Sequence, residues 1–96
     1  MNGFYLVGRI AQEPERTQTA GGYTICRLRI SVNKANKEQE GEDLFEVVLF
    51  RGLADEIYKV GQNVAVSGRI QANNFEKEGT TYYHANLLGN SVTVIS

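Results

Sequence analysis

Apolar and polar residues alternate along much of this chain, with the two-residue period of half-buried β-strands. In residues 23–33, the apolar face consists of Cys26, Leu28, Ile30 and Val32, and the polar face of Arg27, Arg29, Ser31 and Asn33. In residues 44–51, one face consists of Phe45, Val47 and Leu49, and the other of Leu44, Glu46, Val48 and Phe50. Both segments are therefore predicted as strands that bury one face.

Three further segments have similar strand chemistry, and turn-forming residues separate them. The segments are residues 4–10, 62–75 and 80–95, the last interrupted at Gly89-Asn90. Pro14 follows the first segment, where a residue without an N–H group is tolerated at a strand end. Glycine-containing turns are predicted at residues 19–22 and 77–79.

One segment, residues 52–60, predicts a helix. Leu53, Ile57 and Val60 share one helical face, and Gly61 follows as a stop signal. Residues 34–43 are polar and charged instead, and they predict a long mobile loop.

The order of these elements indicates the fold class. Five strands with one short helix between the third and the fourth are typical of the OB-fold, an all-β Greek-key barrel that binds oligonucleotides and oligosaccharides. Gly8 and Gly68 lie inside predicted strands, where glycine is typical of a bulge or a tight barrel bend. A chain of 96 residues has room for one such barrel, so residues 1–96 are predicted to form a single OB domain.

The composition argues against several classes of function. A formal net charge of −1 lacks the basic excess typical of nucleic-acid-binding domains, so such binding would depend on where the charges lie. No apolar run is long enough to cross a membrane, and the first residues lack the features of a signal peptide, so we expect a cytoplasmic protein without membrane contacts. Cys26 and His84 are single residues of their type and are interpreted as structural or incidental. The sequence shows no serine or cysteine nucleophile with a suitable general base, and no phosphate-binding loop. We therefore expect no enzyme, cofactor, metal or small-molecule substrate.

Single-stranded DNA binding requires a positive groove that follows the backbone and aromatic faces on which bases stack. The candidate stacking residues are Phe50 and Phe75, and the candidate phosphate-binding residues are Arg27, Arg29, Arg51, Arg69, Lys34, Lys37 and Lys77. Phe50 is assigned to the outer face because three other residues already supply the apolar face of its strand. Phe75 stays open between core and surface, and Tyr23, Tyr82 and Tyr83 stay open between packing and stacking. The alternative for Arg27, Arg29 and Arg69 is that they keep a solvated sheet soluble, but exposed arginines on adjacent strands of a small barrel favour a binding role.

Several stretches occur together in an order that resembles a known family. They are Leu6-Val7-Gly8-Arg9-Ile10 with Glu13-Pro14-Glu15, Glu46-Val47-Val48-Leu49-Phe50 with Leu53-Ala54-Asp55, and Val64-Ala65-Val66-Ser67-Gly68-Arg69-Ile70. In their spacing, they are similar to the bacterial and phage single-stranded DNA-binding protein family. The resemblance extends over essentially the whole chain.

The resemblance implies a homotetramer, or less often a dimer, of OB domains that wraps DNA over its outer surfaces. The stacking aromatics of the family match Phe50 and Phe75, but Asn36 and Leu44 stand where the family often has tryptophan. Glu46 replaces an arginine that is common in the third strand, so weaker DNA affinity is expected. Members usually continue into a flexible tail with an acidic tip, and we expect an OB domain without that tail.

The leading hypothesis is sequence-independent binding and protection of single-stranded DNA in replication, recombination or repair. The expected partners are single-stranded DNA and further copies of this chain, and Tyr5 and Val7 would be buried by a partner subunit. One alternative is a primosomal replication-restart protein, a short dimeric OB domain without a tail. Another is an OB interaction module with weak DNA affinity, which the near-neutral charge favours. The preference between RNA and DNA stays open.

Overall fold

The computed structural model describes residues 1–34 and 41–96, which form eight strands and one short helix. The strands are β1 (Phe4–Ile10), β2 (Glu15–Gln18), β3 (Thr24–Asn33), β4 (Glu42–Phe50), β5 (Asn63–Ala72), β6 (Phe75–Lys77), β7 (Thr80–Tyr82) and β8 (Ala85–Val94). The helix is α1 (Arg51–Asp55). No helix in the described part of the chain is long and apolar enough to cross a membrane.

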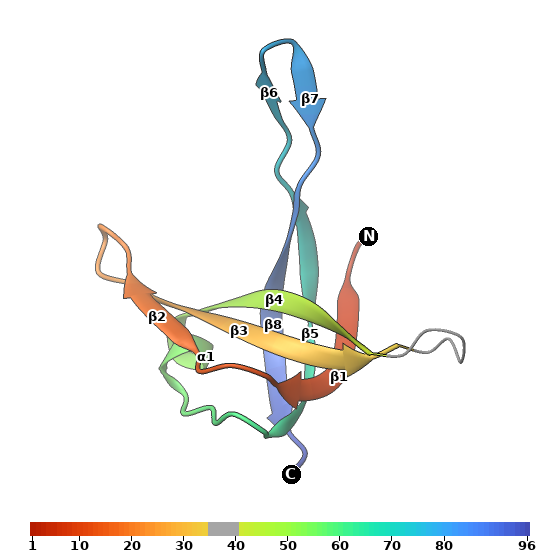
Figure 1. The fold of residues 1–96 in the computed structure, drawn as a ribbon. Coiled ribbons are helices and arrows are strands. Elements are labelled where there is room, and N and C mark those ends of the chain that lie inside the picture. Colours follow the sequence, from red (N-terminus) through yellow and green to blue (C-terminus); the bar gives the residue numbers. More distant parts are fainter. Residues whose placement is uncertain (35–40) are drawn as a thin grey trace.

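Five of the strands close into a barrel, as predicted (Figure 1). Their order is β1-β5-β8-β4-β3, and an additional pairing between β1 and β3 closes the circle. The pairings are antiparallel except between β4 and β8, which run parallel over two residue pairs. β2 extends the sheet beside β3. This arrangement confirms the predicted OB-fold, with α1 between the third and the fourth barrel strands.

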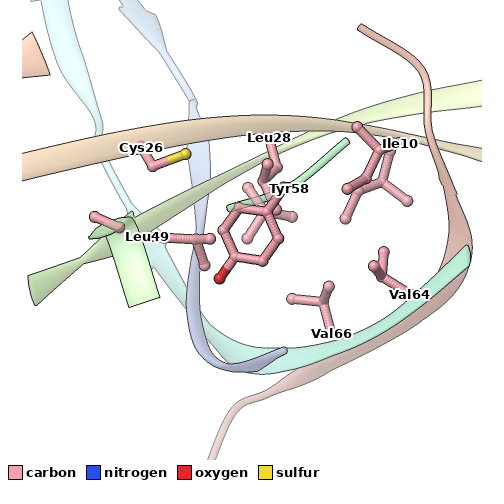
Figure 2. Close-up of a cluster of buried hydrophobic side chains, with 10 residues drawn as sticks. Ile10, Cys26, Leu28, Leu49, Tyr58, Val64 and Val66 are labelled. Atoms are coloured by element: carbon pink, nitrogen blue, oxygen red, sulfur yellow. The ribbon is translucent and has the colours of Figure 1, made fainter. Parts of the chain in front are cut away.

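The barrel interior holds most of the residues that the two-residue pattern assigned to it, whereas Val32 and Phe45 are only half-buried (Figure 2). The largest fully buried side chains come from β1, β3, β4 and β5: Ile10, Cys26, Leu28, Ile30, Val47, Leu49, Val64 and Val66. Burial of each large aliphatic side chain stabilises the fold by roughly 1.5–3 kcal/mol. Burial also raises the pKa of the Cys26 thiol, in keeping with a packing role for this residue.

The predicted helix over residues 52–60 is wrong in its length and in its buried face. α1 ends at Asp55, and Glu56 is extended, with φ −68° and ψ 155°. Ile57 is consequently 78% exposed, and Tyr58 occupies the core position instead, with an exposed fraction of only 6%. The Tyr58 hydroxyl donates a hydrogen bond to the carbonyl oxygen of Leu53 at 2.8 Å, and burial raises the pKa of Tyr58 to about 12.

Arg16, a residue of β2, stabilises the C-terminal end of α1. The Arg16 guanidinium donates from Nε to the carbonyl oxygen of Ala54 at 3.0 Å, and from its second amino group to the carbonyl oxygen of Glu56. The last carbonyls of a helix have no partner within the helix. Arg16 supplies that partner from another strand, so the helix can stop after five residues without an unsatisfied end.

The predicted strand over residues 62–75 is divided into two strands, and the second belongs to a hairpin arm. β6 and β7 form a separate two-stranded sheet that projects from the barrel beyond β5 and β8 (Figure 1). Glu78 and Gly79 join them, with φ of 53° and 78°. Two successive positive φ values are those of a type I′ turn, which suits the twist of a hairpin. The predicted turn at residues 77–79 is thus confirmed.

The interruption predicted at Gly89-Asn90 is a bulge within β8 and not a break in the strand. Ser67 pairs with Ser91, whereas the next residue, Gly68, pairs with Gly89, so Asn90 is an extra residue on β8. A Cβ atom on Gly68 would overlap the carbonyl oxygen of Leu88. The close approach of two backbones at this bend therefore requires glycine, as the barrel interpretation predicted.

Candidate nucleic-acid interface

A groove of about 660 Å³ lies on the outer surface of the barrel. It is formed by the turn before β3, the adjoining ends of β3 and β4, the second half of β5 and the middle of β8. Its lining residues are Thr19, Tyr23, Ile25, Phe50, Arg51, Arg69, Gln71, Leu88 and Asn90. We call this the Phe50 groove. It combines aromatic rings, guanidinium groups and side-chain amides in one concave surface.

Two aromatic side chains present accessible faces to the Phe50 groove. Phe50 is 40% exposed on the outer face of β4, as its phase predicted, and it pairs across the sheet with Ile25. Tyr23 is 61% exposed, which answers the question left open for it: it is a surface residue. Its backbone N–H donates to Thr19 Oγ1 at 3.2 Å, and the Thr19 N–H donates to its carbonyl oxygen at 2.8 Å. The turn therefore holds Tyr23 beside the groove.

The cations of the Phe50 groove are Arg51 and Arg69, which come from different elements. Arg51 begins α1, directly after Phe50, and Arg69 lies on β5, opposite Leu88 of β8. Within residues 1–34 and 41–96, neither arginine forms a salt bridge. Their guanidinium groups are therefore available to an anion that enters the groove.

The hairpin arm carries a second aromatic surface, outside the Phe50 groove. Phe75 and Tyr82 are paired residues of β6 and β7, and their rings are stacked, with centroids 5.2 Å apart and planes inclined by 18°. Phe75 is 48% exposed, so it is a surface residue and not part of the core. Tyr83 is more exposed still, and Lys77 lies at the turn of the same hairpin. The arm thus carries aromatic faces and a cation away from the barrel.

Arg27 and Arg29 lie on the outer face of β3, as predicted, but carboxylates already pair with both. Arg27 Nε is 3.5 Å from Glu46 Oε1, and Arg29 Nη2 is 3.1 Å from Glu46 Oε2. Arg29 also donates from Nη1 to Glu15 Oε1 at 2.8 Å, and this hydrogen bond raises the pKa of Arg29. These two arginines are not brought together with Arg51 and Arg69 in the Phe50 groove.

Two of the three candidate lysines lie within the described residues, in different parts of the fold. Lys34 forms an ion pair with Asp43. Lys77 lies on the arm, at the end of β6. Lys37 falls outside the described residues, as does Asn36, and β4 begins at Glu42 within the segment predicted as a loop.

Sequence reasoning missed five residues that line the Phe50 groove: Thr19, Ile25, Gln71, Leu88 and Asn90. Gln71 carried a usable signal, because it follows Arg69 by two residues and so shares its face of the strand. Asn90 did not, because a bulge is not visible in the alternation of residues. Within the described residues, no cluster of three or more His, Cys, Asp or Glu side chains could hold a metal ion.

A closed five-stranded barrel with this strand order is an OB-fold, and its outer groove combines aromatic and basic side chains. Comparison with known proteins narrows the class further. The model of the single-strand binding protein family matches residues 1–95, and the chain belongs to that family.

Individual relatives agree with the family assignment. The chain is 33% identical to the single-stranded DNA-binding protein of Oceanobacillus iheyensis over 99 residues, covering 96% of this chain and 62% of that protein. It is 32% identical to the protein of the same name from Bacillus cereus, with coverage of 96% and 58%. It is 29% identical to single-stranded DNA-binding protein 1 of Staphylococcus aureus, with coverage of 96% and 64%. The chain therefore spans about three-fifths of the length of the relatives it matches.

A solved structure supports the fold independently. A chain of the Plasmodium falciparum SSB complex with ssDNA superposes with a TM-score of 0.72, covering 99% of this chain and 93% of that chain. The two sequences are 20% identical, so the likeness establishes the shared architecture.

Proposed function

We propose that this chain binds single-stranded DNA without sequence preference and protects exposed strands in replication, recombination or repair. The observation that carries the proposal is the Phe50 groove, where exposed aromatic faces lie beside Arg51 and Arg69. Membership of the single-strand binding protein family supports it, as do the names of the relatives. The function is binding and not catalysis, and we propose the cytoplasm as its location.

In the proposed complex, bases stack on the rings of Phe50 and Tyr23. Each base stacked on an aromatic side chain contributes roughly 1–3 kcal/mol, whatever the base, because every base has a π-face. Arg51 and Arg69 contact the phosphates that join these bases. In a duplex, paired and stacked bases hide their faces, so single strands are preferred.

The arm extends the proposed path beyond the barrel. Phe75 and Tyr82 present a stacked pair of rings, and Lys77 supplies a cation on the same hairpin. A strand that leaves the Phe50 groove along β5 and β8 reaches this arm, because the arm continues those two strands (Figure 1). The arm would therefore add contacts for longer oligonucleotides.

A titration with labelled oligo(dT), matched duplex DNA and poly(U) tests the proposal, at low and at moderate salt. We expect oligo(dT) to bind more tightly than duplex and to weaken with salt, because phosphate contacts release counterions. Phe50→Ala should weaken oligo(dT) binding about tenfold, from the loss of one stacking surface. Ile57→Ala removes an apolar side chain that is even more exposed but lies outside the groove, and it should bind like the parent. Equal affinity of parent and Phe50→Ala would contradict the proposal.

We also propose that the chain assembles into a homotetramer through β1. Among the residues that the structure describes, Phe4 to Gly8 pair with β5 alone, because the contact of β1 with β3 is limited to Arg9 and Ile10. A free strand edge is a template for pairing with another chain. On the same strand, Tyr5 is 69% exposed and Val7 50% exposed.

Analytical ultracentrifugation tests this assembly. A tetramer is the expected species, and a dimer would favour the replication-restart alternative. Sedimentation as a monomer at high micromolar concentration would contradict assembly through β1.

A second candidate is an OB module for assembly with other proteins and with little DNA affinity. The observation that favours it is the neutralisation of Arg27 and Arg29 by Glu15 and Glu46, in a chain of net charge −1. The titration separates the candidates, because this second function predicts no binding of oligo(dT) at micromolar protein and low salt.

A further inference from the structure

Four charged side chains form a continuous ion-pair network across the outer face of three neighbouring strands. Glu15 lies on β2, Arg27 and Arg29 on β3, and Glu46 on β4. Glu46 contacts both arginines, at 3.5 and 3.1 Å, and Glu15 contacts Arg29 at 2.8 Å. We call these four residues the charge network. Its two guanidinium groups and two carboxylates have no net charge.

Glu46 connects the parts of the charge network. It is the cross-strand partner of Arg29, and its two carboxylate oxygens are divided between the two arginines. The Arg29 side chain is only 23% exposed, so water screens its pairs less than it would a fully exposed pair. Neither arginine therefore presents an uncompensated positive charge to the solvent.

The charge network lies directly beside the Phe50 groove. On β3, Arg27 follows the groove residue Ile25 by two residues, and on β4, Glu46 precedes the groove residue Phe50 by four residues. Even spacings keep side chains on the same face, so Arg27 and Glu46 share the outer face of the sheet with the groove residues. Glu46 also lines a second hollow of about 480 Å³, between β4 and the beginning of β8. A strand that leaves the Phe50 groove along the sheet consequently meets this network.

We propose that Glu46, with Glu15, is an internal competitor of the DNA backbone that limits the affinity of this face. The inference rests on the proposed function. A carboxylate and a phosphate bind the same guanidinium donors with similar geometry, so they exclude one another. A phosphate reaches Arg27 or Arg29 only after a carboxylate is displaced, and the displaced carboxylate then repels the strand. DNA contacts consequently concentrate on the Phe50 groove, whose arginines have no carboxylate partner among the described residues.

The decisive variant is Glu46→Gln, which keeps the shape and one oxygen acceptor but removes the charge. Arg27 then loses its carboxylate partner, whereas Arg29 keeps Glu15. We expect oligo(dT) affinity to rise roughly threefold to tenfold, because a competing surface ion pair is lost and the repulsion between Glu46 and the strand is relieved. One further phosphate contact should steepen the plot of log affinity against log salt by about 0.7. Surface pairs contribute little to stability, so the variant should stay folded, which circular dichroism checks.

The matched control is Glu42→Gln. It removes the same charge from an ion pair of the same kind, between Glu42 and Arg9 at 3.3 Å, and this pair lines a different hollow. A second background, Arg27→Gln with Arg29→Gln, tests whether Glu46 acts through the arginines. In that background, Glu46→Gln should raise affinity no more than Glu42→Gln does.

The outcomes separate this inference from the proposed function. A larger gain for Glu46→Gln than for Glu42→Gln, lost in the background without the two arginines, supports the inference. A parent that binds oligo(dT) with an unchanged Glu46→Gln overturns the inference and leaves the proposed function standing. A gain that persists without Arg27 and Arg29 overturns it as well, because Glu46 then repels DNA directly. If neither parent nor Glu46→Gln binds, both the inference and the proposed function are wrong.

Discussion

Arg51 combines an unusual backbone conformation with a place in the Phe50 groove, and its replacement tests both. Its φ is 54°, in the left-handed region, where a residue with a Cβ atom is less stable by roughly 1–2 kcal/mol. Gly52, the next residue, would adopt that conformation without strain, but its φ is not positive. The chain thus has an arginine where the backbone favours glycine, and a glycine where it does not.

The expected magnitude follows from two opposing effects. Arg51→Gly relieves the left-handed strain of roughly 1–2 kcal/mol, whereas glycine loses roughly 0.5–1 kcal/mol more conformational freedom on folding than alanine does. Arg51→Gly should therefore be more stable than Arg51→Ala by about 0.5–1 kcal/mol. At position 52, alanine should be the more stable residue instead of glycine. A Cβ atom there meets nothing within 4 Å, so Gly52→Ala should stabilise the helix by about 0.5–1 kcal/mol.

Urea denaturation at one fixed protein concentration measures these differences, and the fixed concentration removes the effect of assembly. The exchanged variant, Arg51→Gly with Gly52→Arg, keeps the composition and should be more stable than the parent. Under the proposed function, Arg51→Gly also removes one phosphate contact, so its salt dependence should be shallower by about 0.7 on the logarithmic plot. A more stable protein that binds DNA less well is the combined expectation.

Two results would refute this reasoning, one for the backbone and one for the phosphate contact. If Arg51→Ala were as stable as Arg51→Gly, or more stable, residue 51 would not have a strained left-handed backbone. If instead Arg51→Gly were more stable than Arg51→Ala, as predicted, but its DNA binding had the salt dependence of the parent, Arg51 would not contact phosphate.

Two further predictions concern the barrel itself. Because the pKa of Tyr58 is about 12 in the fold and ordinarily near 10, the unfolded chain releases its phenolic proton first, so stability should fall by roughly 2 kcal/mol between pH 10 and pH 12. Denaturation at several pH values should give a smaller decline for Tyr58→Phe, and an equal decline would contradict the assignment. Gly68→Ala should destabilise the fold by roughly 3 kcal/mol, because its Cβ atom would overlap a backbone carbonyl. Thermal denaturation should show no such loss for Gly52→Ala, and an unchanged Gly68→Ala would exclude the close approach.

The barrel strands could be predicted from the sequence because each has a buried face with a two-residue period. Leu28 and Val47, for example, are fully buried where the alternation assigns them to the core. The prediction of the helix was wrong because Ile57 and Val60 have the spacing of one helical face although both are exposed. The core residue of this segment is Tyr58. A tyrosine with a partner for its hydroxyl is not distinguishable from a surface tyrosine by periodicity alone.

The candidate site was only partly predictable, for a different reason. Phe50 could be assigned to the outer face because strand phase decides it. The pairing of Arg29 with Glu15 and Glu46 depends on the register between strands, which alternation within one strand does not determine. The arginines were therefore predicted on the correct face but without their carboxylate partners.

The central claim is that single-stranded DNA occupies the Phe50 groove. Titration of the isotopically labelled protein with oligo(dT), followed by amide chemical shifts, tests it most directly. We predict that the largest shifts occur at the residues lining the groove, among them Tyr23, Phe50, Arg51 and Gln71, with small shifts at Tyr5 and Val7 on β1. Shifts confined to β1, or no shifts at saturating oligo(dT), would contradict the account.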